Sequence, residues 1–263
     1  MARTRLDHLL VERGLFESRS RAAAAVMAGG VRLGHDGRRA RKAGEMVAAG
    51  EALAVDAPPR FVSRGGEKLA NALDALGVEG AGRRCLDVGA STGGFTDCLL
   101  QRGAAHVVAL DVAYGELHWR VRSDERVTVV ERRNARSLDA SGLPYRPDLV
   151  VADVSFISLA KILPAVLAST AARFDCLALV KPQFEVGRER VGRGGVVRGA
   201  DERRAALVAV AQTARDLGYA VLGFASSGLP GPAGNRESFV WVAESGRPGE
   251  VADLEKAARR AEP

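Results

Sequence analysis

The chain has 263 residues, enough for one large domain or for a large and a small one, each with a buried core. Its apolar fraction of 47% and charged fraction of 27% are those of an ordinary soluble protein. No apolar run approaches the roughly 20 residues of a membrane span, and charged residues interrupt the N-terminus where a signal peptide would need an apolar core. We therefore expect a cytoplasmic protein that does not bind membranes.

The cysteines and the charge distribution narrow the kinds of ligand and partner that the protein could bind. Cys85, Cys98 and Cys176 are too few and too widely spaced to suggest metal ligands, so we expect buried thiols and no metal site. Residues 1–64 hold 12 Lys and Arg against 7 Asp and Glu, a surplus of five out of the net charge of +6. A basic N-terminal segment followed by a nearly neutral remainder predicts that the N-terminal segment contacts a polyanion.

Residues 1–57 predict a small α+β domain. Two helical patterns, residues 5–14 and 18–30, precede two short strand patterns at 31–37 and 50–56. Arginines lie on or beside both helices, and a helix start also favours phosphate. The predicted RNA-binding residues are Arg3, Arg5, Arg19 and Arg21. Pro58 and Pro59 then break regular structure, which predicts a linker over residues 58–64.

Residues 65–263 are predicted to form the second domain, in which strand and helix patterns alternate from Cys85 onward. The predicted strands cover residues 84–89, 106–112, 127–131, 148–154, 176–181, 220–225 and 238–243. Such alternation predicts an α/β sheet with helices on both faces. The last two strands are joined by a loop without a helix, which indicates an antiparallel final strand. The predicted fold class is thus a seven-stranded, Rossmann-like methyltransferase sheet with the small α+β domain in front of it.

The glycine-rich turn "LDVGASTGGFTDCLL" follows the first strand of this sheet. It matches neither the dinucleotide fingerprint nor the P-loop, since Phe95 stands where the P-loop has its lysine. In open α/β sheets, ligands lie beyond the carboxyl ends of the strands, which is where Asp87 and the turn Gly89–Gly94 are placed. The next strand ends at Asp111, whose carboxylate could accept hydrogen bonds from two ribose hydroxyls. We therefore expect S-adenosylmethionine as the cofactor.

Four charged residues are predicted to face one crevice at the same edge of the sheet: Lys68, Asp153, Lys181 and Glu237. A ribose 2′-hydroxyl is a poor nucleophile at neutral pH. An ammonium group lowers the pKa of such a hydroxyl, and a desolvated lysine could itself take its proton. Other acceptors fit less well, because the chain lacks the Asn/Asp-Pro-Pro-aromatic motif of amino methylation and places Cys176 at the wrong end of its strand for attack on a cytosine ring.

Six ordered motifs resemble the TlyA (haemolysin A-like) family of ribosomal RNA 2′-O-methyltransferases over almost the whole chain: "VSRGGEKL", "LDVGASTGGFTDCLL", "HVVALDVAYGEL", "LVVADVSFISL", "LVKPQFEVG" and "LPGPAGNRES". The resemblance implies a ribosomal-protein-like RNA-binding domain at the N-terminus and a cytidine ribose in ribosomal RNA as substrate. It implies that Lys68, Asp153, Lys181 and Glu237 are a catalytic tetrad. It also implies a cofactor site formed by Gly89, Ala90, Ser91, Thr92, Gly93, Gly94, Phe95, Thr96, Asp111 and Asn134.

Two residues depart from the family's usual pattern. Arg133 replaces a threonine in "ERRN", and Ala113 replaces a glycine in "DVAYGEL". Two other functions stay open at this point. A non-catalytic factor that binds RNA or ribosomes would keep the basic domain without needing four charges at strand ends. A membrane-lytic haemolysin would need an amphipathic or apolar segment, which the sequence does not show. No obligate protein partner is evident.

Overall fold

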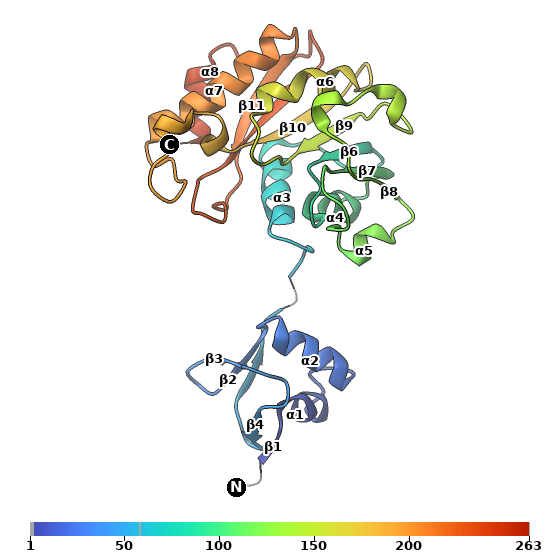
Figure 1. Cartoon of the computed structure of the whole chain (residues 1–263), viewed down its shortest axis with the longest axis vertical. Helices are drawn as coiled ribbons and strands as arrows, with labels where there is room; N and C mark the ends of the chain where they lie inside the picture. Colours follow the sequence, from blue (N-terminus) through green and yellow to red (C-terminus); the bar gives the residue numbers. More distant parts are fainter. Residues whose placement is uncertain (1–2, 58, 263) are drawn as a thin grey trace. The chain divides into compact units, whose positions relative to one another are not determined.

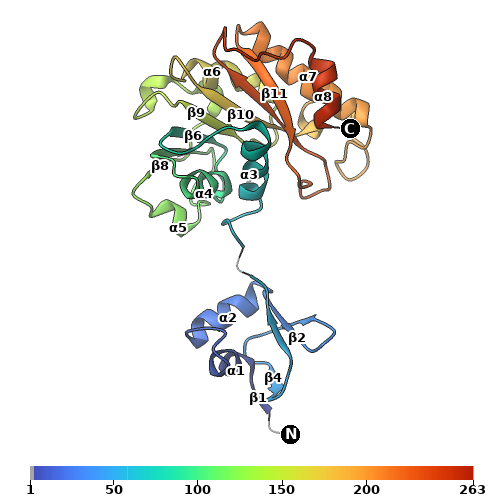
Figure 2. The same cartoon turned by 180° about the vertical axis from the view of Figure 1, so that it is seen from behind.

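A computed structural model describes residues 3–57 and 59–262 (Figures 1 and 2). The chain divides into two compact units, Met1–Pro59 and Arg60–Pro263. Phe61, which we expected in the linker, belongs to the core of the second unit, and the Val62 N–H donates to the buried Asp97 carboxylate at 2.8 Å. The second unit therefore begins inside the expected linker, several residues before residue 65.

The first unit packs two helices on short strands. Its elements are β1 (Arg3–Arg5), α1 (Leu6–Glu12), α2 (Arg19–Met27), β2 (Val31–Leu33), β3 (Arg38–Arg39), β4 (Met46–Ala48) and β5 (Leu53–Val55). β1 pairs with β4, and β2 lies between β3 and β5. Ser18 caps α2, since its hydroxyl accepts from the Arg21 N–H at 3.3 Å. Leu6, Leu10, Val31 and other buried apolar side chains form a separate core. The expected small α+β fold is confirmed, although the sequence did not predict β1, β3 and β4.

The second unit is built on one seven-stranded sheet in the order β11-β12-β10-β9-β6-β7-β8. The strands are β6 (Arg84–Val88), β7 (His106–Leu110), β8 (Val127–Val130), β9 (Leu149–Ala152), β10 (Asp175–Val180), β11 (Ala220–Ser226) and β12 (Ser238–Ala243). β12 is antiparallel to both of its neighbours, β10 and β11. All seven predicted strands and the antiparallel last strand are confirmed.

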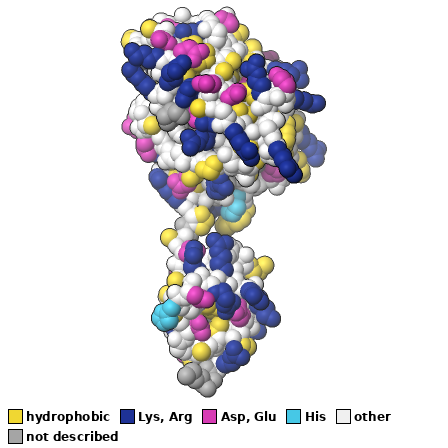
Figure 3. All heavy atoms as spheres, turned by 90° about the vertical axis from the view of Figure 1, so that its left-hand side faces the viewer, with side chains coloured by type: hydrophobic (Ala, Val, Ile, Leu, Met, Phe, Trp, Pro, Cys, Tyr) yellow, Lys and Arg dark blue, Asp and Glu magenta, His cyan; other side chains and the backbone are white. Residues whose placement is uncertain are grey.

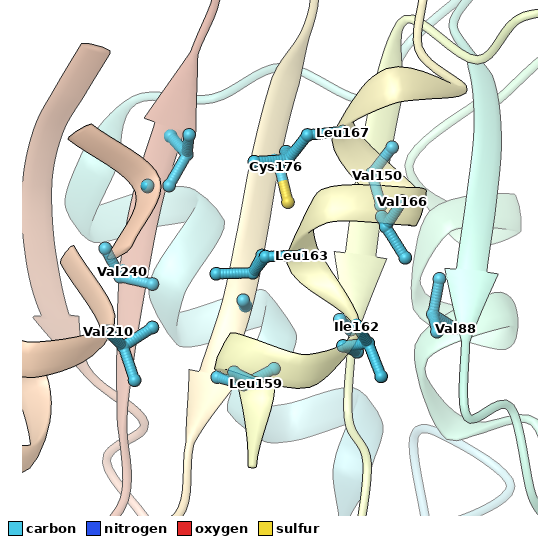
Figure 4. Packing of buried hydrophobic residues seen from close by; sticks show 14 of the residues in the cluster. Val88, Val150, Leu159, Ile162, Leu163, Val166, Leu167, Cys176, Val210 and Val240 are labelled. Atoms are coloured by element: carbon cyan, nitrogen blue, oxygen red, sulfur yellow. The ribbon is translucent and has the colours of Figure 1, made fainter. Parts of the chain in front are cut away.

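Helices cover both faces of this sheet. Helices α3 (Gly65–Leu76), α4 (Gly94–Gln101) and α5 (Trp119–Arg122) contribute to the core on one face. Helices α6 (Leu163–Ala168), α7 (Ala200–Asp216) and α8 (Leu254–Ala261) pack on the other, where Leu163, Val166 and Val210 meet Val150 and Val240 (Figure 4). Short 3₁₀ helices lie in the connections: η1 (Ala135–Ser137), η2 (Ala140–Gly142), η3 (Leu159–Lys161), η4 (Pro182–Phe184) and η5 (Arg188–Arg190).

The cysteines are buried in this unit as predicted. Cys85, Cys98 and Cys176 are free thiols with no more than traces of exposed surface. Burial raises the pKa of each to about 12, so none is present as the thiolate that nucleophilic attack requires. Cys176 also lies near the amino end of β10, away from the edge at which ligands bind in open sheets.

Candidate active site

Two adjacent cavities lie at the carboxyl ends of the central strands. The first, here the ion-pair cavity, has a volume of about 440 Å³ and contains all four predicted tetrad residues, Lys68, Asp153, Lys181 and Glu237. The second, here the Asp111 cavity, has a volume of about 490 Å³. Gly89, Ser91, Asp153 and Ser155 line both cavities, so a single extended molecule could occupy the two together.

The tetrad forms two ion pairs of different exposure. Lys68 Nζ, from α3, lies 2.5 Å from Glu237 Oε2, and only 7% and 1% of these side chains are exposed. Lys181 Nζ, after β10, lies 2.5 Å from Asp153 Oδ1, after β9, with 13% and 22% exposed. Lys181 Nζ also donates to Ser155 Oγ at 2.9 Å. The more accessible lysine is thus Lys181.

The direction of β12 explains why Glu237 joins this group. Residues that follow parallel strands meet at one edge of a sheet, which places Asp153 beside Lys181. An antiparallel neighbour begins at that edge, and Glu237 immediately precedes β12, whose Ser238 pairs with Val180. Lys68 reaches the same edge from the first turns of α3, which packs against α4.

The glycine turn between β6 and α4 forms the floor shared by the two cavities. Gly89 has φ of +85°, and a Cβ there would overlap the Asp153 carbonyl oxygen. At Gly94, a Cβ would overlap Ser63 Oγ in the "VSRGGEKL" segment. The turn therefore approaches both neighbouring segments more closely than any side chain would permit.

Asp111 holds this turn in place. Its Oδ2 accepts from the Ser91 N–H at 2.7 Å, and its Oδ1 accepts from the Ala113 N–H at 2.8 Å. Its carboxylate lines the Asp111 cavity, as does Asn134, whose Oδ1 accepts from the Arg136 N–H at 3.0 Å. Carboxylate and amide oxygens with spare lone pairs are suited to accept hydrogen bonds from a sugar or a base.

Three predicted cofactor residues do not line either cavity. Asp87 is fully buried and accepts from Thr96 Oγ1 at 2.6 Å, and Gly93 is the N-cap of α4. Burial raises the pKa of Asp87 to about 7, and its Oδ1 has no hydrogen-bond partner among the described residues. Asp87, Gly93 and Thr96 therefore have a structural role in the turn. The ion-pair cavity is lined by the other residues of the turn: Gly89, Ala90, Ser91, Thr92, Gly94 and Phe95.

The structure adds residues that the sequence prediction missed. Phe156 lines the Asp111 cavity with 92% of its surface exposed and φ of +63°, a region that bulky side chains rarely adopt. Its loop is anchored by Glu185, which accepts from Ser158 Oγ at 2.6 Å and the Leu159 N–H at 2.9 Å. The sequence does hold one indication of Phe156. An aromatic residue stands three positions after Asp153, in a predicted loop where no hydrophobic periodicity requires it.

Asn235 was also missed, although it lies in the quoted motif "LPGPAGNRES". Only 1% of its surface is exposed. Its Oδ1 accepts from the Val197 N–H at 2.9 Å, and its Nδ2 donates to the Gly195 carbonyl at 2.8 Å. These bonds fix the segment that leads into Glu237 against the loop after η5.

The predicted RNA-binding arginines lie on the first unit. Figure 3 shows several Lys and Arg side chains on one face of that unit. Arg5 and Arg19 both contact Asp7, and Arg21 contacts Glu17. The side chains of Arg5, Arg19 and Arg21 stay 53%, 56% and 68% exposed, so each keeps donors free for a further acceptor.

Together, the antiparallel last strand, the glycine turn and the strand-end acid define the second unit as an α/β methyltransferase. Family models agree: residues 61–244 match the FtsJ-like methyltransferases, and residues 4–53 match the S4 domain. The chain belongs to the TlyA family of FtsJ-like methyltransferases.

Three similar proteins support this family assignment. The 16S/23S rRNA (cytidine-2′-O)-methyltransferase TlyA of Mycobacterium tuberculosis is 50% identical over 98% of this chain and 97% of its own. Hemolysin A of Brachyspira hyodysenteriae is 36% identical over 89% of this chain and 97% of its own. The solved structure of a Streptococcus thermophilus protein that carries the name hemolysin is 38% identical, with a TM-score of 0.74 over 99% of this chain and 96% of its own. No helix in the described part of this chain is long and apolar enough to cross a membrane.

Proposed function

We propose that this protein transfers a methyl group from S-adenosylmethionine to the ribose 2′-hydroxyl of a cytidine in ribosomal RNA. The observation that carries the proposal is the pair of lysine–carboxylate contacts in one cavity, next to a second cavity lined by Asp111. The choice of cytidine, and of both ribosomal subunits, rests on the printed name of the relative with 50% identity. The cytoplasm is the place where such a substrate is found.

The cofactor fits the Asp111 cavity and its junction with the ion-pair cavity. Asp111 would accept hydrogen bonds from the ribose hydroxyls, and Asn134 would face the adenine. Gly89 and Ser91 line both cavities, so the amino-acid end could extend past them toward the ion-pair cavity. When bound, S-adenosylmethionine supplies an electrophilic methyl group on a positively charged sulfur.

Lys181 and Asp153 would act on the acceptor hydroxyl. Lys181 would donate a hydrogen bond to the 2′-oxygen, and its positive charge would lower the pKa of that hydroxyl. As the new oxygen–carbon bond forms and the bond between the methyl group and sulfur breaks, the hydroxyl proton would pass to the Asp153 carboxylate, since the Lys181 ammonium has no lone pair to accept it. The buried Lys68–Glu237 pair has no net charge, and it would fix the wall of the cavity that receives the acceptor hydroxyl.

Phe156 lines the cavity assigned to the cofactor, and its exposed ring would also offer the cytosine a stacking surface. A base whose ribose enters the ion-pair cavity must leave its stack, and an exposed aromatic ring offers a sequence-tolerant stacking surface. The Phe156 ring lies 5.3 Å from that of Phe184 in a tilted arrangement, and most of its surface stays exposed. Glu185 would hold this platform in place through the Ser158 hydroxyl.

The S4 unit would dock the enzyme on its substrate. Its arginines can contact phosphates without reading sequence, which positions the second unit and leaves specificity to the site. Ribosomal RNA or whole ribosomal subunits are therefore the proposed partners, with no obligate protein partner.

The decisive experiment maps ribose methylation on purified ribosomal subunits incubated with the protein and labelled S-adenosylmethionine. We expect label on one cytidine 2′-oxygen in each subunit that is a substrate, and none with Lys181→Ala. Absence of label, together with absence of cofactor binding by calorimetry, would favour a non-catalytic RNA-binding factor. Lysis of red cells by the Lys181→Ala protein would instead support an independent haemolytic activity.

A further inference from the structure

In the first unit, one carboxylate organises two of the proposed phosphate-binding arginines. Arg5 donates to Asp7 through Nε at 3.0 Å and through Nη2 at 2.9 Å, and Arg19 donates to the same carboxylate through Nη2 at 3.0 Å. Asp7 also accepts from the His8 N–H at 2.9 Å. Both oxygens of one buried acid are thus fully engaged in placing two guanidinium groups side by side.

Asp7 is itself held firmly. Its side chain is 7% exposed, whereas those of Arg5 and Arg19 are 53% and 56% exposed. The backbone N–H groups of Leu6 and Asp7 donate to the Glu45 and Ala43 carbonyls, each at 2.9 Å. The arginine hydrogen bonds hold the pKa of the Asp7 carboxyl well below its usual range, so its charge persists at all working pH values.

Arg5 is also restrained on its other side. A Cβ at Gly44 would lie 3.2 Å from Arg5 Nη2, which means that the guanidinium rests directly over the bare Gly44 backbone. A bidentate contact with a carboxylate uses one edge of a guanidinium and leaves the donors of the other edge free. Arg5 therefore presents its remaining donors in a fixed direction.

We infer that Asp7 is a positioning residue for RNA binding, which holds Arg5 and Arg19 as a preformed two-guanidinium clamp for backbone phosphate. The inference rests on the proposed docking role of the S4 unit. Long arginine side chains lose rotamer freedom when they bind, and a clamp that is already ordered avoids most of that cost. This accounts for an acidic residue in a surface that binds a polyanion. The ordering of the two arginines by Asp7 favours RNA binding more than the negative charge of Asp7 opposes it.

A role for Asp7 in net charge and a role in positioning predict opposite changes in RNA binding when its charge is removed. If only net charge mattered, Asp7→Asn would make the unit more positive and tighten RNA binding. As a positioning residue, Asp7 should behave in the opposite way. We expect Asp7→Asn to weaken binding of the full-length protein to purified ribosomal subunits on the order of tenfold at fixed salt. Asp56→Asn is the matched control, since it removes an acid that pairs with Arg32 in the same unit. That control should bind as tightly as the unchanged protein, or more tightly.

A double-mutant cycle separates positioning from general destabilisation. Asp7→Asn should have no further effect in a protein that already carries Arg5→Ala and Arg19→Ala. Arg5→Lys, which keeps the charge but loses the two-bond geometry, should weaken binding several-fold even if Asp7→Asn fails to fold. Thermal unfolding of each variant tests whether the first unit is folded, and S-adenosylmethionine binding tests the same for the second unit.

The outcomes are distinguishable. Weaker binding by Asp7→Asn that disappears in the double-arginine background supports the inference. Equal or tighter binding by Asp7→Asn, with weak binding by Arg5→Ala/Arg19→Ala, overturns the inference and leaves the docking role standing. Unchanged binding by the double-arginine variant overturns the docking role and the inference with it.

Discussion

Lys68 and Glu237 are 169 residues apart in the chain, yet Lys68 Nζ and Glu237 Oε2 lie 2.5 Å apart with almost no solvent access. Taking two charges out of water is costly, and the contact repays the cost only while both partners are present. The pair therefore joins α3 to the start of β12 and couples the stability of the second unit to the geometry of its cavity.

Removing one partner of this pair should separate stability from activity. Glu237→Leu leaves the Lys68 ammonium buried without a counter-charge, and we expect it to lower the free energy of unfolding by about 3–5 kcal/mol. Lys68→Met/Glu237→Leu should recover most of that loss, yet both proteins should fail to transfer methyl groups. Denaturant titration and single-turnover methylation measure the two effects. A double variant with normal turnover would show that the pair is purely structural.

Lys181→Ala should abolish chemistry without affecting the cofactor. Lys181 contacts Asp153 and Ser155 at the acceptor side, whereas Asp111 lies in the neighbouring cavity. We expect the methylation rate to fall roughly 100-fold to 10,000-fold, with S-adenosylmethionine affinity unchanged in calorimetry. Lys256→Ala, an exposed lysine of α8, is the control. Near-normal turnover of Lys181→Ala would show that Lys181 is a charged residue at the end of a strand with no role in methyl transfer.

Asp111→Ala should weaken cofactor binding. The change removes a charged acceptor for two hydroxyls and also releases the Ser91 N–H that orders the glycine turn. Hydrogen bonds to charged groups contribute about 1.5–3 kcal/mol, so affinity should fall roughly tenfold or more. Calorimetry with Asp216→Ala, an exposed acid at the end of α7, gives the baseline. A folded Asp111→Ala protein with full affinity would refute the ribose assignment.

Asp87 should make the second unit less stable as pH rises. Its carboxyl has a pKa of about 7 in the folded protein because of burial, whereas in the unfolded chain it loses its proton near pH 4. Between those values the native state binds more protons, so the free energy of unfolding should fall with rising pH, by at most about 1.4 kcal/mol per unit. The difference between the unchanged protein and Asp87→Asn isolates this effect in urea titrations. A difference that does not vary with pH would show that Asp87 is ionised throughout.

A protein that begins at Ala57 should fold and bind S-adenosylmethionine, because the core of the second unit starts at Phe61. We expect it to fail on ribosomal subunits, since the proposed docking arginines are gone. Scintillation counting of methylated subunits tests this directly. Full-rate methylation by the shortened protein would mean that the charge surplus of residues 1–64 has another purpose.

The sequence predicted the fold well because its signals are local. Each strand of the second unit is a short apolar run, and the loop between the last two strands already indicated an antiparallel turn. The boundary between the two units was harder to predict from the sequence. Nothing in the local pattern near Phe61 indicates that it packs under α3 and not in a linker.

The candidate site was predictable as a set of residues but not as a set of contacts. That four charges share one sheet edge follows from strand order, whereas the partnership of Lys68 with Glu237 and of Lys181 with Asp153 depends on long-range packing. The same holds for Asp7, which looks like an ordinary helix-start acid in the sequence. Phe156 was missed because its exposure and positive φ are properties of the folded loop alone.

The place of β12 in the sheet has a consequence for the order of events during synthesis. β11 reaches the sheet only through β12, which lies between it and β10 although it is translated last of the seven strands. A nascent chain that has completed the S4 unit and six strands therefore lacks Glu237 and has no attachment for β11. Such a chain has the complete sequence of its S4 unit before the second unit can complete its sheet, so the proposed RNA binding would become possible before the proposed methylation.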